Sequence, residues 1–345
     1  MEVLEKIRVT VDAMGSDNAP HNEVLGSIEA ASERKDLEII LVGRENEIRK
    51  VLEKQNYQLG NLSVVNADEV VTMEDNPSEA YKQKPNSSIN IALNLQLENK
   101  ADAFISAGNT GAVLASSTLK LGRIEGISRP TIGSMFPSEK GNVMLFDVGA
   151  TVDCRANNLV EYALMGSVYS SYILGVENPK VGLLSVGEEN TKGNELTLEA
   201  YELLSKSGLN FVGNVEGGDI LKGKVDVVVC DGFVGNIILK FAESVLGLLK
   251  AKFRKLAESS LINKFKVGMA QSTLRQISKE FDYQYYGGVP LLGVNGVSII
   301  GHGKSTPLAI KNMIFRAEET VRKRVNDRIK AVLKNRKINN NKNIK

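Results

Sequence analysis

Short apolar, β-branched runs alternate along the chain with stretches of helical spacing. The strand-like runs are 7–11, 37–42, 62–65, 103–106, 131–135, 143–148, 181–186, 209–212 and 225–230, and the helical stretches between them include 20–34, 45–55, 86–99 and 111–121. Such alternation is typical of parallel strands joined by crossover helices. The runs are apolar throughout rather than at every second position, which indicates a sheet buried on both faces. The pattern therefore predicts an α/β fold with a doubly wound, mostly parallel sheet.

Two regions break this rhythm. Residues 236–281 contain no strand pattern and predict a projecting helical hairpin with a turn near Ser259 and Ser260. Residues 335–345 are polar and aperiodic, and they predict a disordered tail. We expect residues 7–334 to form a single α/β catalytic unit that contains the hairpin as an insertion.

Composition narrows the classes of function. The chain has 345 residues, 42% of them hydrophobic, and a net charge of only +2, so no overall field favours nucleic acid. Two cysteines, Cys154 and Cys230, are too few for a disulfide framework, and two histidines cannot form an H-E-x-x-H metal helix. No unbroken apolar run approaches the ~18 residues that span a bilayer, and the first residues lack a signal-peptide pattern. These features predict a soluble, cytoplasmic protein.

Several nucleotide and hydrolase motifs fail. Gly303-Lys304-Ser305 resembles the end of a P-loop, but Ser298 stands where that loop requires glycine. No G-x-G-x-x-G follows a strand, and no G-x-S-x-G is present. A nucleotide-dependent enzyme or a serine hydrolase is therefore disfavoured.

Loops rich in Gly, Asn, Asp and Ser follow several of the predicted strands. They span 12–20, 106–111, 147–153, 186–193, 231–236 and 287–303. Ligands of parallel α/β sheets bind beyond the carboxyl ends of the strands. In the loop 106–111, small residues and the start of the next helix suit an anion, with Ser106 and Thr110 as hydroxyl donors. Taken alone, that loop is better explained by Asn109 or Thr110 acting as a helix cap, with glycines that only shape a turn.

Single polar residues in these loops also have structural explanations. Asp12 and Asp231 suit strand termination and capping, and Lys192 and Arg129 suit solvated ion pairs. Histidine is the residue type suited to carrying a proton at neutral pH, so His302 could do so, although an isolated histidine is more often structural.

The predicted hairpin carries an apolar stripe and basic charge. The stripe includes Ile237, Phe241, Val245 and Phe253 at helical spacing, and packing against a partner subunit is its favoured explanation. Near the turn, apolar and basic residues mix, as in segments that lie on anionic membranes. The candidate contacts to a membrane or an acidic carrier protein are Lys252, Lys255, Leu261, Ile262, Lys264 and Phe265.

Several of these segments together resemble one known family. The run 11–20, VDAMGSDNAP, resembles the opening of the acyl-acyl carrier protein:phosphate acyltransferase (PlsX) family. Similar blocks follow in the expected order at 106–112, 126–130, 147–150 and 231–236, and at His302-Gly303 with Ser305. Ser16 and Lys304 are departures from the family pattern. The resemblance covers roughly residues 7–334.

The resemblance implies transfer of a fatty acyl group from acyl carrier protein to inorganic phosphate, which gives acyl phosphate for phospholipid synthesis. It implies a fold similar to phosphate acetyltransferases and the isocitrate dehydrogenase-like group, with no metal, cofactor or nucleic acid. The implied partners are a second copy of the chain, the membrane surface, and a membrane glycerol-phosphate acyltransferase that uses the product.

This chemistry suggests roles for the loop residues. Phosphate is itself a nucleophile, and the thioester carbonyl requires oxyanion stabilisation. We expect Asn109, His302 and Asp231 to act in catalysis. The candidate phosphate- or substrate-binding residues are Asp12, Asn18, Ser106, Gly108, Thr110, Gly111, Arg129, Lys192 and Asn236. Two alternatives are an oxidoreductase of the isocitrate dehydrogenase-like group and a non-catalytic membrane-surface scaffold that docks acyl carrier protein.

Overall fold

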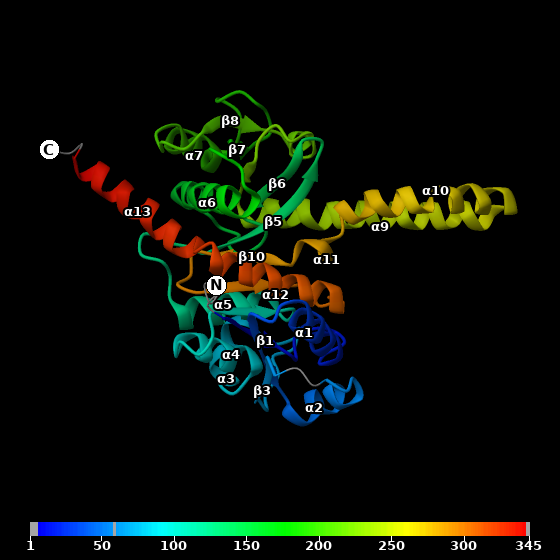
Figure 1. The fold of residues 1–345 in the computed structure, drawn as a ribbon. Helices are drawn as coiled ribbons and strands as arrows, with labels where there is room; N and C mark the ends of the chain where they lie inside the picture. Colours follow the sequence, from blue (N-terminus) through cyan, green and yellow to red (C-terminus); the bar gives the residue numbers. More distant parts are fainter. Residues whose placement is uncertain (1–5, 58–59, 343–345) are drawn as a thin grey trace, which may run out of the picture.

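The computed structural model describes residues 6–57 and 60–342 and contains one sheet of eleven strands in the order β3-β2-β1-β4-β11-β10-β5-β6-β9-β7-β8 (Figure 1). One end of the sheet is wholly parallel. Its strands are β1 (Ile7–Asp12), β2 (Leu37–Gly43), β3 (Leu62–Asn66) and β4 (Ala103–Ser106). The predicted α/β class is confirmed.

The other end of the sheet combines a hairpin with parallel strands. β5 (Thr131–Ser138) and β6 (Gly141–Phe146) pair antiparallel. The parallel strands β9 (Val227–Val229), β7 (Val181–Leu184) and β8 (Phe211–Val215) follow β6.

Two strands from late in the chain join these ends. β10 (Val289–Leu292) pairs antiparallel with both β5 and β11 (Val297–Ile300), and β11 pairs parallel with β4. The sequence predicts only a glycine-rich loop here. The two strands have four residues each and include Pro290, so their local pattern is too short to distinguish them from a loop.

Helices cover both faces of the sheet, and alternate strand residues enter different apolar clusters. Val143 and Leu145 pack in one cluster, whereas Met144 and Phe146 pack in another on the opposite face. On the β1 side, α1 (His21–Glu33) and α12 (Pro307–Arg322) share a face, and α4 (Ser88–Leu97) and α5 (Thr110–Leu121) cover the other. The predicted burial of both faces is confirmed.

The remaining short helices complete the two ends. They are α2 (Glu45–Lys54), α3 (Pro77–Gln83), α6 (Ala156–Tyr169) with a π-helical turn (Ser170–Leu174), α7 (Glu195–Ser205), α8 (Gly217–Lys222) and α11 (Tyr283–Tyr286). Tyr162 and Leu159 of α6 are fully buried against the β6 side of the sheet.

The predicted hairpin consists of α9 (Gly232–Ser259) and α10 (Leu261–Glu280), which lie side by side and project from the body (Figure 1). Its apolar stripe is exposed in this chain; Phe241 is 69% and Leu248 56% accessible. Among the described helices, α9 is long and apolar enough to cross a membrane by length and composition, with a stretch of mean hydropathy 1.5 that is 11% buried. Sequence analysis did not identify this helix as a candidate membrane span, because Lys240 and Glu243 interrupt the apolar run.

The C-terminal prediction needs a correction. α13 runs from Val325 to Lys342, so residues 335–342 are helical rather than disordered, and 343–345 lie outside the described residues. Val325, Ile329 and Leu333 anchor the helix in the same apolar cluster as α6. Once a helix is nucleated, each further residue adds a hydrogen bond at little extra cost, so polar residues can prolong it.

Candidate active site

A cavity of about 470 Å³ opens between the two ends of the sheet. Three neighbouring parallel strands, β1, β4 and β11, direct their carboxyl-end loops to it and contribute Asp17, Gly108 and His302. β5, β10 and the first turns of α9 form the remaining wall. The cavity therefore lies where ligands of parallel sheets usually bind.

One part of the cavity wall is polar and most of the rest is apolar. The polar part comprises Asp17, Gly108, Thr110, Asn236, His302, Gly303 and Ser305. The apolar part includes Ile132, Met135, Phe136, Met144, Val148, Leu174, Leu239, Ala242, Leu246, Val289, Pro290 and Met313. This arrangement suits an amphipathic ligand with a long apolar portion and a polar reacting group.

Of the predicted residues, Gly108, Thr110, Asn236 and His302 line this cavity together. Thr110 is the first residue of α5, and the N–H groups and dipole of a first helical turn favour an anion. The structure thus brings the start of this helix to a cavity that also contains a histidine.

Asp12 and Ser106 lie directly behind the cavity loop. Ser106 Oγ donates to Asp12 Oδ2 at 2.6 Å and accepts from the Gly108 N–H at 3.1 Å. Burial raises the pKa of Asp12, although the hydrogen bond from Ser106 opposes that shift. A methyl group on Gly15 would lie 2.7 Å from Gly108 N, so the close approach of these loops requires glycine. Asp12 and Ser106 support the loop from its buried side.

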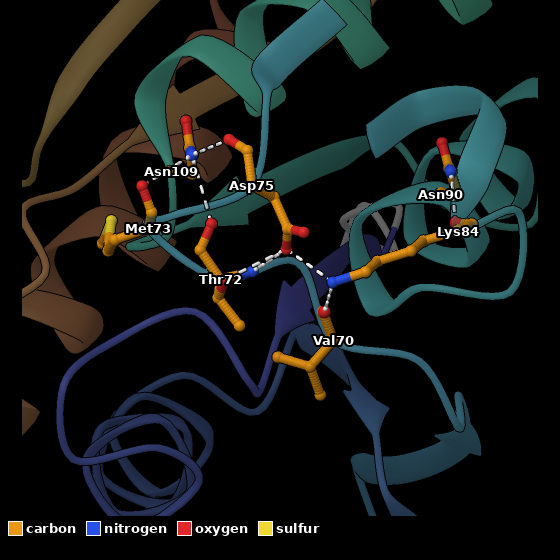
Figure 2. Close-up of polar contacts among 7 residues, drawn as sticks. All are labelled: Val70, Thr72, Met73, Asp75, Lys84, Asn90 and Asn109. Carbon is orange, nitrogen blue, oxygen red and sulfur yellow. Dashed lines mark hydrogen bonds and ion pairs between the residues drawn. The ribbon is translucent and has the colours of Figure 1, made fainter. Parts of the chain in front are cut away.

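Asn109 has a different task from the predicted one. Its Oδ1 accepts from the Ala112 N–H at 3.1 Å and caps α5, while its Nδ2 donates to the carbonyl oxygens of Thr72, Met73 and Asp75 (Figure 2). Both polar atoms of the amide are therefore engaged, which contradicts a direct role in oxyanion stabilisation. The capping alternative describes the observed contact.

Figure 2 shows that Asn109 is part of a wider clamp on the segment 70–75. Lys84 Nζ donates to Asp75 Oδ2 at 2.5 Å and to the Val70 carbonyl at 2.8 Å. The hydrogen bonds from Lys84 and the Thr72 N–H lower the pKa of Asp75. The clamp holds Met73 in the cavity wall.

The backbone around His302 selects one tautomer of its ring. The Lys304 N–H donates to His302 Nδ1 at 3.1 Å, and His302 also lines the cavity. A neutral ring whose Nδ1 accepts a hydrogen bond carries its proton on Nε2. Nε2 is therefore the protonated nitrogen of the neutral ring.

Besides Asp12, Ser106 and Asn109, five further predicted residues do not line the cavity: Asn18, Gly111, Arg129, Lys192 and Asp231. Asp231 Oδ1 accepts from the Val234 N–H and caps α9, as the structural alternative for this residue describes. Lys192 is exposed on the loop after β7, and Arg129 lies beside a different cavity. The order of the loops along the sequence does not show that the loops of Lys192 and Arg129 lie outside the cavity.

The cations that do line the cavity are paired with glutamates. Lys240 Nζ lies 2.9 Å from Glu243, and Arg316 Nη1 lies 2.7 Å from Glu319. An anion in this cavity would consequently depend on N–H, hydroxyl and imidazole donors more than on the predicted Lys192 or Arg129.

The apolar wall was missed by sequence analysis. Leu239, Ala242 and Leu246 recur at helical spacing on α9 and line the cavity, whereas the stripe singled out from the sequence lies on the exposed face. Spacing alone does not distinguish the two stripes, because it is the same in both. The signal that could have identified the cavity-lining stripe is that Leu239 follows closely after the polar loop that ends at Asn236.

Glu23 of α1 is a fully buried acid behind the first loop. Its Oε1 accepts from the Ser16 N–H at 2.9 Å, and its Oε2 has no hydrogen-bond partner among the described residues. Burial raises the pKa of Glu23 to about 7.

Nowhere in residues 6–57 and 60–342 do three or more His, Cys, Asp or Glu side chains group closely enough to hold a metal ion.

Comparison with known proteins identifies the family. A family model described as "Fatty acid synthesis protein" matches residues 7–328. The chain belongs to this family. Two relatives named phosphate acyltransferase are those of Halothermothrix orenii, 46% identical over 92% of this chain and 96% of the relative, and of Desulforudis audaxviator, 48% identical over 92% and 93%.

The fold of this family member also resembles two solved phosphotransacetylases. The EutD phosphotransacetylase from Staphylococcus aureus covers 92% of this chain and 94% of its own, with a TM-score of 0.61 and 15% identity. A phosphotransacetylase from Streptococcus pyogenes gives the same coverage and TM-score with 17% identity. At this identity the likeness concerns the fold alone, and it confirms the predicted similarity to phosphate acetyltransferases.

Proposed function

We propose that the protein transfers a fatty acyl group from acyl carrier protein to inorganic phosphate and releases acyl phosphate. The observation that carries this proposal is the single cavity that joins a long apolar wall to the start of α5 and His302. The apolar wall suits the acyl chain, and the helix start suits phosphate. The names of the relatives and the family description support the same reaction.

In the proposed reaction, a phosphate oxygen attacks the thioester carbonyl carbon and the C–S bond then breaks. The electron pair of that bond leaves on sulfur, and the thiolate takes up a proton to become the free thiol. In this proposal His302, which lines the cavity, gives the proton from Nε2, and phosphate returns one to the ring. No serine or cysteine nucleophile is needed.

The hairpin is the proposed contact to a membrane surface. Residues 240–280 contain nine Lys or Arg and three Asp or Glu, a net charge of +6 in a chain whose total is +2. At its tip, Leu261 is 85%, Ile262 68% and Phe265 70% accessible, and Lys264 lies among them. Apolar and basic groups together favour an anionic bilayer. At the membrane surface, a membrane glycerol-phosphate acyltransferase would receive the acyl phosphate. We also propose that the protein is a cytoplasmic homodimer.

The scaffold alternative leaves the cavity without a function, because docking a carrier protein needs only a surface.

To test the proposal, purified protein would be incubated with palmitoyl-acyl carrier protein and phosphate, while free thiol is followed and acyl phosphate is trapped with hydroxylamine. Palmitoyl-coenzyme A in a parallel reaction tests whether the carrier matters. We expect hydroxamate to form only when phosphate is present. Release of thiol without hydroxamate would mean that the protein hydrolyses the thioester. If no thiol is released, the scaffold alternative is favoured.

A further inference from the structure

A second cavity, of about 620 Å³, lies away from the first and shares no lining residue with it. Its wall comes from the loop Gly126–Arg129, from Asp153 and the first turns of α6, and from Leu333 and Arg336 near the end of α13. Sequence analysis could not assemble this cavity, because it treats the end of α13 as a disordered tail.

Three arginines, Arg129, Arg155 and Arg336, line this cavity. Within the part of the chain that the structure describes, no hydrogen bond, ion pair or ring contact engages their guanidinium groups. Nine other arginines each make such a contact: Arg8, Arg34, Arg44, Arg49, Arg123, Arg316, Arg322, Arg324 and Arg328. Arg254 on the hairpin is the remaining described arginine without one. Unpaired guanidinium groups are thus concentrated at this cavity.

One of the two acidic residues that line this cavity, Glu161, is engaged by hydrogen bonds. Glu161 accepts from the Ser128 N–H at 2.9 Å and from Ser128 Oγ at 2.8 Å. Asn158 Nδ2 in turn donates to Ser128 Oγ at 2.6 Å. These bonds fasten the loop that carries Arg129 onto α6 and engage both carboxylate oxygens of Glu161, which forms no ion pair with the three arginines among the described residues. The cavity therefore has a fixed floor and uncommitted cations.

We propose that this cavity binds an organic phosphate that also carries hydroxyl groups, such as a sugar phosphate or a nucleotide. Guanidinium groups bind phosphate oxygens in pairs of parallel hydrogen bonds, and the positive end of the α6 dipole adds to their field. Asp153, which makes no ion pair among the described residues, supplies an acceptor for a ligand hydroxyl. A volume of this size accommodates a ligand of that class.

Isothermal titration of the full chain with ribose 5-phosphate, adenosine monophosphate, ribose and inorganic phosphate tests the proposal. We expect the two organic phosphates to bind and ribose not to bind. Arg155→Gln and Arg336→Gln should each weaken binding about tenfold or more, because each removes a charged hydrogen-bond donor. Arg254→Gln is the matched control and should bind as the unaltered chain does.

Thermal unfolding of each variant without ligand shows whether the variant is folded, so that a loss of binding is not mistaken for a loss of folding. The proposal fails if neither organic phosphate binds, if inorganic phosphate alone binds, or if both cavity variants bind normally. It is independent of the proposed acyl transfer, since the binding assay contains no acyl donor and the acyl-transfer assay no organic phosphate.

Discussion

At the scale of single residues, Asn109 determines how the α5 loop meets the segment 72–75. Its amide makes one bond to the helix and three to backbone carbonyl oxygens. An alanine at this position leaves those groups without their partner, although the chain around them is unchanged. The residue that the sequence marked for chemistry is thus a positioning residue.

Asn109→Ala should lower the free energy of unfolding by about 1–2 kcal/mol, as lost helix caps do. Urea denaturation measures the change, and Asn46→Ala offers an exposed asparagine for comparison. A variant with full stability but no acyl transfer would return Asn109 to the catalytic group.

His302→Gln should reduce turnover by roughly 10²-fold or more, because glutamine keeps a donor but cannot release a proton. The rate of thiol release at saturating phosphate measures this loss. Wild-type turnover in the variant would show that the leaving thiolate takes its proton elsewhere. His21→Gln, on the exposed start of α1, is the control.

Glu23 makes stability depend on pH. An unfolded glutamate ionises near pH 4.5, whereas the buried group stays protonated to about pH 7. Between these values the folded state binds more protons, so stability falls as pH rises, by roughly 3 kcal/mol for a shift of this size. Asp12 has a raised pKa for the same reason and adds to the decline.

Glu23→Gln should remove the Glu23 part of this decline. Urea denaturation at pH 5 and pH 8 should show the variant gaining on the unaltered chain at the higher pH, because glutamine has no proton to lose. Parallel pH dependences for the two proteins would mean that Glu23 is ionised in the fold.

At the scale of elements, the sequence was informative where a run was long. The strand β2 and the helix pair α9–α10 were predicted close to their observed bounds because seven or more residues repeat one pattern. β10 and β11 were not, since four residues around glycines carry no period. For the site, the sequence identified the polar loops, but strand order decides which of these loops meet. Local composition does not encode strand order, and Lys192 and Arg129, whose loops lie outside the cavity, are the examples.

The exposed hairpin tip yields a test at this scale. Phe265→Asp should reduce binding to vesicles of anionic lipid in a flotation assay, because it removes an accessible apolar group and adds a repelled charge. Val186→Asp, at an 82% accessible valine in the loop after β7, serves as the control and should float normally. Equal flotation of both variants would exclude the tip from membrane contact.

At the scale of the whole molecule, the cavity joins side chains from both ends of the sheet, and its apolar wall should limit the length of the acyl chain. Ala242→Phe would place a ring into that wall. Turnover with a palmitoyl donor should fall more than with a butyryl donor, measured as kcat/KM for each. Ser244→Phe, on the exposed side of the same helix, should leave the ratio unchanged.

The central position of β10 and β11 also has a consequence for synthesis. The chain emerges from the ribosome with β1–β9 complete long before residues 289–300 appear, and until then β4 and β5 each present an unpaired edge. Open edges invite pairing with other chains. A nascent or truncated product that ends before residue 289 would therefore be two half-sheets without a bridge, exposed to aggregation and dependent on chaperones until the last sixth of the chain arrives.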